Sequence, residues 1–128
     1  MKMQTKKEEL YKDILEKRQR ISEFAEDFIF IIDNNLFVQY CNGHAAKHLG
    51  CCQREVIGKP LKDLFPPNSY ETLKQNLQMV FESGESSSAE NNIAFPDKEL
   101  LLDSRFTTIK ERDVVTGVLV IARAITER

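Results

Sequence analysis

The order of strand-like and helical segments limits what this chain can fold into. Five segments rich in β-branched, aromatic or alternating apolar residues read as strands: 28–33, 36–40, 87–95, 99–109 and 114–124. In this part of the chain, the helical signals all fall between the second and third of these strands. This order predicts an α+β fold, in which a five-stranded antiparallel sheet carries its helices on one face.

The helical signals between the strands differ in strength. Asn42 is a candidate N-cap for a short helix that ends at Gly50, and a further helical turn stops at Gly58. A longer helix is predicted from an N-cap at Asn68 to a stop at Gly84. Its apolar residues recur at spacings of three, four and three, and they are Tyr70, Leu73, Leu77 and Val80. One face of this helix should therefore cover the core.

Residues 1–27 form a separate segment, followed by a compact domain at 28–128. The segment holds seven basic and seven acidic side chains of the 18 and 20 in the whole chain, and it has no Gly or Pro. Its apolar residues follow a heptad spacing, apart from polar Lys7 and Lys17, and include Leu10, Ile14, Ile21 and Phe24. Because such a narrow stripe pairs with a partner helix, we expect a homodimer through these four residues. The alternative is a helix that lies on its own sheet.

Net charge, the length of apolar runs and cysteine content indicate where the domain is located and which partners it lacks. A net charge of −2 gives no electrostatic drive toward nucleic acid. The longest apolar runs, Phe28–Ile32 and Val118–Ala122, are far shorter than the ~20 residues of a membrane span. Three cysteines, two of them adjacent, do not make a disulfide framework. These features predict a cytoplasmic domain without nucleic-acid or membrane contact.

Four pieces, in order along the chain, carry a resemblance to a known family. They are FAEDFIFIIDNN, YCNGHAAKHLG, REVIGKPLKDLF and GVLVIARAITER. Together they resemble the PAS domain, a sensory module of histidine kinases, cyclic-di-nucleotide enzymes and transcription regulators. The family often ends on Asp-Ile-Thr, whereas this chain has Ala124-Ile125-Thr126, which puts the coupling contact of that acidic residue in doubt. The resemblance implies a signal-relay domain, with a histidine kinase as the first expectation for the larger protein.

Every His and Cys of the chain lies between positions 41 and 52. His44 and His48 share a face if their segment is helical, and Cys41 and Cys51 flank it, so a zinc site can be drawn from these four. The alternative is a pair of surface histidines beside small buried thiols, which is the usual place of free cysteine. The adjacent Cys51 and Cys52 could act as a redox switch beside Arg54, or be two unreactive thiols.

Cofactors of related domains fit poorly. Haem-binding PAS domains are similar to one another in using a His on the long helix, and the long helix predicted here has none. Blue-light PAS domains carry a Cys in a motif that binds flavin covalently, and the cysteines here stand in a different context. Haem and flavin are therefore disfavoured, which leaves an unknown small apolar ligand or none. The candidate lining residues, for which core packing is the alternative role, are Phe30, Leu73, Leu77, Phe106 and Leu119.

No catalytic site is predicted. The chain has no Gly-rich phosphate loop, no Ser-centred nucleophile elbow and no His-Glu-x-x-His motif. Two functions from different classes remain. The first is a sensor that passes a signal to an effector domain further along the same chain. The second is a constitutive dimerisation scaffold of a transcription regulator or cyclic-di-nucleotide enzyme, and a Cys/His metal sensor is a third possibility.

Overall fold

The structure is a computed structural model that describes residues 27–125. The predicted heptad helix, with Leu10, Ile14, Ile21 and Phe24, lies outside the described residues. Its dimer contact therefore stays a prediction.

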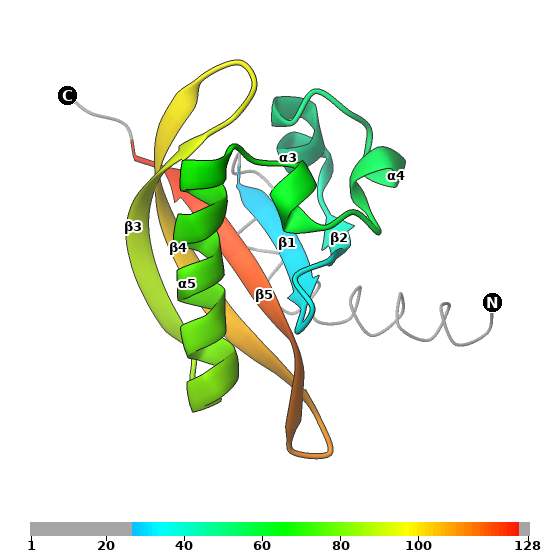
Figure 1. Ribbon diagram of the computed structural model, residues 1–128, viewed down its shortest axis with the longest axis vertical. Helices are drawn as coiled ribbons and strands as arrows, with labels where there is room; N and C mark the ends of the chain where they lie inside the picture. The colour runs from blue at the N-terminus through cyan, green and yellow to red at the C-terminus, as the bar shows by residue number, and fades with distance from the viewer. Residues whose placement is uncertain (1–26, 126–128) are drawn as a thin grey trace.

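A five-stranded antiparallel sheet forms the centre of the fold (Figure 1). The elements in chain order are β1 (Phe28–Asp33), β2 (Val38–Cys41), α3 (Gly43–His48), α4 (Gln53–Val56), the 3-10 turn η1 (Leu61–Asp63), α5 (Pro67–Ser83), β3 (Ser87–Ala94), β4 (Glu99–Glu111) and β5 (Val114–Ala124). The strands lie side by side in the order β2-β1-β5-β4-β3. The predicted α+β class is confirmed, and the helices do fall between the second and third strands.

The connection between the first two strands is longer than predicted. The carboxylate of Asp33 accepts hydrogen bonds from the backbone N–H groups of Asn35 and Phe37, at 2.9 and 3.0 Å. Leu36 adopts a φ of 65°, which is turn geometry. The second strand therefore begins at Val38 rather than at Leu36, because two residues of the predicted strand are spent on the turn.

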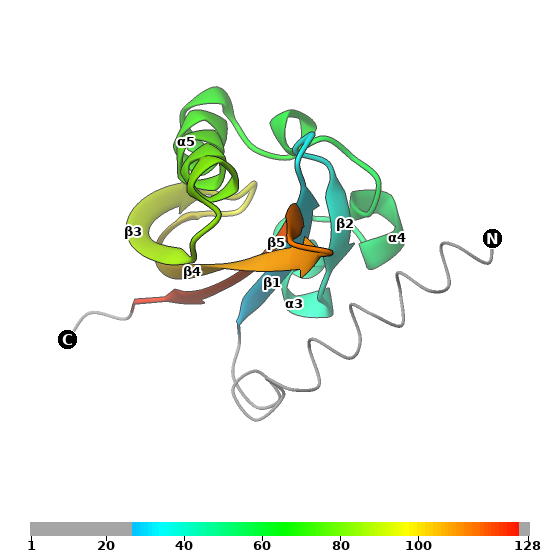
Figure 2. The ribbon, with the colours of Figure 1, turned by 90° about the horizontal axis from the view of Figure 1, so that it is seen from below.

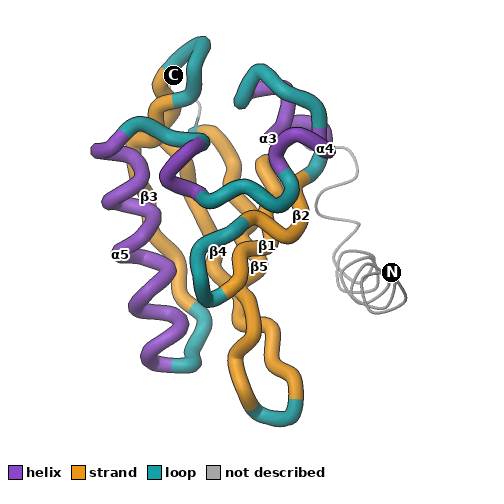
Figure 3. The backbone as a smooth tube through the Cα atoms, turned by 45° about the vertical axis from the view of Figure 1, so that its right-hand side comes forward, coloured by secondary structure: helices purple, strands orange, loops and turns teal. Residues whose placement is uncertain are grey.

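Helix α5 lies along one side of the sheet, over β3, β4 and β5 (Figure 2; Figure 3 shows the same helix as a tube). It ends at Gly84, whose φ of 72° is the left-handed C-cap that the sequence predicts. The predicted start at Asn68 is wrong, because the helix begins at Pro67. Proline suits the first helical position, where its missing N–H costs no hydrogen bond.

The two faces of the sheet carry different apolar clusters. The helix-covered face contributes alternate strand residues to the main core, including Leu102 and Phe106 of β4 and Val118, Val120 and Ala122 of β5. The opposite face carries a second, smaller cluster drawn from the strands, which is Ile29, Ile31, Ile109 and Leu119. Because side chains alternate along a strand, a shift of one position moves a residue from one cluster to the other.

Within residues 27–125, no helix has the length and apolar character needed to cross a membrane.

Candidate functional site

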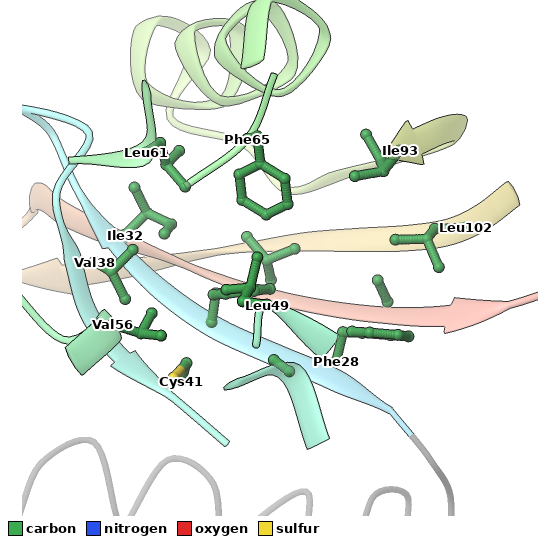
Figure 4. Close-up of a cluster of buried hydrophobic side chains, with 14 of the residues drawn as sticks. Phe28, Ile32, Val38, Cys41, Leu49, Val56, Leu61, Phe65, Ile93 and Leu102 are labelled. Atoms are coloured by element: carbon green, nitrogen blue, oxygen red, sulfur yellow. The ribbon is translucent and has the colours of Figure 1, made fainter. Parts of the chain in front are cut away.

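An apolar cavity lies between α5 and the helix-covered face of the sheet. Its lining residues come from every strand except β2 and from η1, α5 and the loops beside them, and they are Phe30, Ile32, Leu61, Phe65, Leu73, Leu77, Ile93, Phe95, Leu102, Ser104, Val120 and Ala122. Figure 4 labels five of them, Ile32, Leu61, Phe65, Ile93 and Leu102, around the same part of the core. Apolar side chains thus surround the cavity on the helix side and on the sheet side.

The cavity is small. Its volume is about 30 Å³, which is enough for one or two water-sized molecules. Drug-sized ligands need pockets of roughly 300 Å³ or more. A larger molecule could enter only if side chains turned or α5 moved away from the sheet. Leu73 on α5 is half-buried, so this wall of the cavity lies nearest to solvent.

The structure brings three of the five predicted lining residues to the cavity. Phe30, Leu73 and Leu77 line it. Phe106 is buried in the same core cluster but does not reach the cavity. The placement of Leu119 opposite the long helix is wrong, because Leu119 belongs to the cluster on the other face of the sheet. Its neighbours Val118 and Val120 face the helix instead, as the strand alternation requires.

Ser104 is the polar side chain that sequence reasoning missed. It lies on β4 between Leu102 and Phe106, lines the cavity and is 3% exposed. In the described part of the chain, no hydrogen bond involves its hydroxyl group. The other lining side chains are apolar. The signal in the sequence is a serine at a core-facing position of an alternating strand.

A polar corner forms where β1 begins, around Asp27, Asn42 and Arg123. The Asn42 side-chain oxygen accepts hydrogen bonds from Ala45 N at 3.0 Å and from Ile29 N at 3.2 Å, and Nδ2 donates to Asp27 O at 2.8 Å. The predicted N-cap is confirmed. The same side chain also joins α3 to β1.

The charges of this polar corner are paired. Arg123 Nε lies 3.0 Å from the Asp27 carboxylate, which is 1% exposed, while the Arg123 side chain is 59% exposed. The hydrogen bond that Arg123 donates to Asp27, followed by the negative charge of Asp27, raises the pKa of Arg123 above its usual value. The pair connects the start of β1 to the last residues of β5.

The four residues of the candidate zinc site, Cys41, His44, His48 and Cys51, are not arranged as a metal site in the described part of the chain. Among residues 27–125, no three His, Cys, Asp or Glu side chains are placed to hold a metal ion. His44 and His48 pack edge to face at 4.7 Å between ring centroids, and both rings contact Phe28. His48 Nδ1 is 3.6 Å from the Asp97 carboxylate. The two histidines therefore belong to an aromatic cluster beside the core.

The three thiols differ in exposure. Cys41 is fully buried, and burial, followed by the nearby Cys51 and Cys52, raises its pKa to about 11. Cys51 is half-buried with its thiol 3.5 Å from the Leu49 carbonyl oxygen, and Cys52 is exposed. None of the hydrogen bonds and ion pairs among the described residues joins Arg54 to either thiol. The choice between a redox switch and two unreactive thiols therefore stays open.

Comparison with known proteins shows which family has this fold. Residues 23–128 match the family model described as PAS fold. Phytochrome C of Arabidopsis thaliana is 32% identical over an alignment of 113 residues, which covers 83% of this chain and 10% of that protein. The chain thus spans a tenth of the length of this curated relative.

Solved structures of other proteins share the fold, among them the two that follow. The PAS domain of the quorum-sensing receptor RpfR from Cronobacter turicensis, in complex with C12:0, is 24% identical with a TM-score of 0.68, over 80% of this chain and 96% of that one. A sensory box sensor histidine kinase from Vibrio cholerae is 16% identical with a TM-score of 0.69, over 95% of this chain and 99% of that one. At these identities the likeness shows the fold alone. With the family model covering most of its length, the chain belongs to the PAS family.

Proposed function

We propose that this domain senses a small, mostly apolar molecule in the cavity between α5 and the sheet. A PAS domain is a sensory module, and the observation that supports a ligand here is an apolar cavity with one polar side chain on its wall. The RpfR domain, which has the same fold, holds C12:0. That complex supports the proposal because it shows that an apolar chain can be held by this architecture.

A sensor needs two states that differ in affinity for the stimulus. The cavity of about 30 Å³ is the contracted state, and a bound molecule would hold the expanded one. Its lining includes Val120 and Ala122 of β5 as well as Leu73 and Leu77 of α5. Expansion would therefore shift β5, whose far end is joined to the start of β1 by Arg123 and Asp27. The signal leaves the core along that strand.

The larger protein is proposed to be a cytoplasmic signalling protein, with a histidine kinase as the first expectation. The fold shared with the Vibrio cholerae sensor histidine kinase supports this choice. Homodimerisation through the heptad segment 1–27 and an effector domain further along the chain complete the proposal. A transcription regulator or a cyclic-di-nucleotide enzyme is the alternative.

A second candidate function is a constitutive dimerisation scaffold, and the small size of the cavity favours it. A core already filled by its own side chains needs no ligand. In that case the 30 Å³ space is an ordinary packing defect and not a site. The two functions predict different responses when the cavity is filled.

A search for bound molecules, combined with a variant that fills the cavity, tests the proposed sensor function. Mass spectrometry of molecules extracted from the purified chain, together with thermal shift against a metabolite library, should find small apolar binders. Ala122→Val adds two methyl groups on the cavity wall and should abolish their binding. Ala89→Val, which makes the same change on β3 outside the cavity lining, should leave it intact. Failure to find any binder, with Ala122→Val simply more stable, would favour the scaffold.

The dimer is tested separately on the full chain. Leu10→Glu combined with Ile14→Glu places two charges in the predicted helix seam. Light scattering should show a dimer for the parent chain and a monomer for the variant. A variant that remains a dimer would rule out the seam as the interface.

A further inference from the structure

We infer that Ser104 makes the cavity selective for neutral molecules that carry one hydrogen-bonding group on an apolar body, such as an alcohol or a ketone. This inference rests on the proposed ligand-binding function of the cavity. It goes further by naming the chemical class of the ligand and the side chain that recognises it.

The first support is the position of Ser104. The side chain is 3% exposed, lines the cavity and takes part in no hydrogen bond among the described residues. Its neighbours in register across the sheet are Ala89 and Ala122, which have no polar side-chain atoms to offer. A hydroxyl group that opens onto an apolar cavity without a protein partner leaves a hydrogen bond unmade, so a ligand that supplies the partner gains affinity.

Water cannot serve as that partner well. A buried water is held by about three hydrogen bonds, from at least two polar groups. Ser104 is the one polar side chain among the residues that line the cavity, so a water beside it would leave most of its own hydrogen bonds unmade. A molecule with a single polar group makes the bond to Ser104 and fills the rest of the cavity with apolar atoms.

An ionised ligand fits poorly for the opposite reason. Burying a carboxylate is costly unless it is paired with a charge or with several hydrogen-bond donors. The residues that line the cavity include no Lys, Arg or His, and a serine hydroxyl offers one donor. The cavity should therefore reject the ionised acid of the same chain length as an alcohol that it accepts.

Three probes of equal chain length separate these contributions: hexan-1-ol, hexane and sodium hexanoate at about pH 7, where the acid is ionised. Binding to the full chain is followed by NMR from the methyl groups of Leu73, Leu77 and Ile93, which line the cavity. Hexan-1-ol should shift these methyl signals. Hexanoate should bind at least about tenfold more weakly, in line with the cost of an unpaired buried charge.

Ser104→Ala removes the hydroxyl group with almost no change in volume. It should weaken hexan-1-ol binding about three- to tenfold and leave hexane binding unchanged, since only the alcohol loses a hydrogen bond. Hexane binding to the variant also verifies that the cavity is still formed. Ser88→Ala, on the exposed part of β3, is the matched control and should change nothing.

The outcomes distinguish the two levels of the proposal. If hexane and hexan-1-ol bind the parent chain equally and Ser104→Ala changes neither, the cavity binds ligands but Ser104 does not select them. Hexanoate binding as tight as that of hexan-1-ol would overturn the preference for neutral molecules. If none of the three probes shifts the cavity methyl signals, the proposed ligand site fails and the role of Ser104 fails with it.

Discussion

The polar corner and the cavity both hold a buried polar side chain, Asp27 in one and Ser104 in the other, and they differ in whether that side chain has a partner. At the polar corner, Asn42 makes three hydrogen bonds and the buried carboxylate of Asp27 is paired with Arg123. In the cavity, the hydroxyl group of Ser104 makes none among the described residues. The polar corner therefore stabilises the fold with its own atoms, whereas the cavity leaves a bond for a molecule from outside.

The comparison predicts that the polar corner is costly to disturb. Asn42→Ala should lower the free energy of unfolding by about 3 kcal/mol, because it leaves two backbone N–H groups and one carbonyl without their partner. Urea denaturation measures the change. Asn42→Asp keeps the acceptor and loses only the donor, so it should cost less. Equal, small effects of both variants would show that the polar corner is not a stabilising network.

The ion pair should give the next largest effect. Arg123→Met keeps much of the apolar stem but leaves the buried Asp27 carboxylate unpaired, so we expect a loss of about 1–2 kcal/mol, moderated by the solvent exposure of the guanidinium group. Arg105→Met is a control on the neighbouring strand with an exposed arginine. Chemical denaturation at low and high salt checks both. If the two variants are equally stable, the pair contributes nothing.

The buried thiol of Cys41, next to Asn42, should make folding stability depend on pH. Its pKa is about 11 in the folded chain against 9.0 ordinarily, so the unfolded chain releases this proton first as pH rises. Folding stability should therefore be intact below pH 9.0 and fall toward pH 11. In Cys41→Ala, the loss of folding stability between these two pH values should be smaller by on the order of 1 kcal/mol. An unchanged loss would show that the thiol is not protected.

Ser104→Ala should have the smallest effect on stability. Because the hydroxyl group has no partner to lose, the variant should unfold within about 0.5 kcal/mol of the parent chain or be slightly more stable. Urea denaturation without ligand is the measurement, and Ser69→Ala is the contrast. Ser69 is also buried, but its hydroxyl oxygen accepts a hydrogen bond from Ala94 N at 2.9 Å, so its loss should cost about 1 kcal/mol. A loss of that size at Ser104 would reveal a partner.

The sequence predicts the local parts of this architecture better than the contacts between distant segments. The cap at Asn42 and the stop at Gly84 depend on neighbouring residues, and both are confirmed. The sequence predicts the wrong face for Leu119, because an unbroken apolar run hides which residues alternate inward. The full role of Asn42 needs its contact with Ile29, which lies 13 positions away.

The residues of the cavity also differ in how far the sequence predicts them. Phe30, Leu73 and Leu77 could be predicted because each lies on an apolar face of its own element. Ser104 could not be singled out, since the strand pattern shows that it faces the core but not that it lacks a hydrogen bond there. That property depends on Ala89 and Ala122, which become its neighbours only when three strands pair.

The most direct test of the difference between the two regions is a crystal structure of the full chain soaked with hexan-1-ol. We expect density for the alcohol between α5 and the sheet, with its oxygen at hydrogen-bond distance from Ser104 Oγ and the polar corner unchanged. An alcohol found only on the surface, or one in the cavity with its oxygen turned away from Ser104, would contradict this expectation.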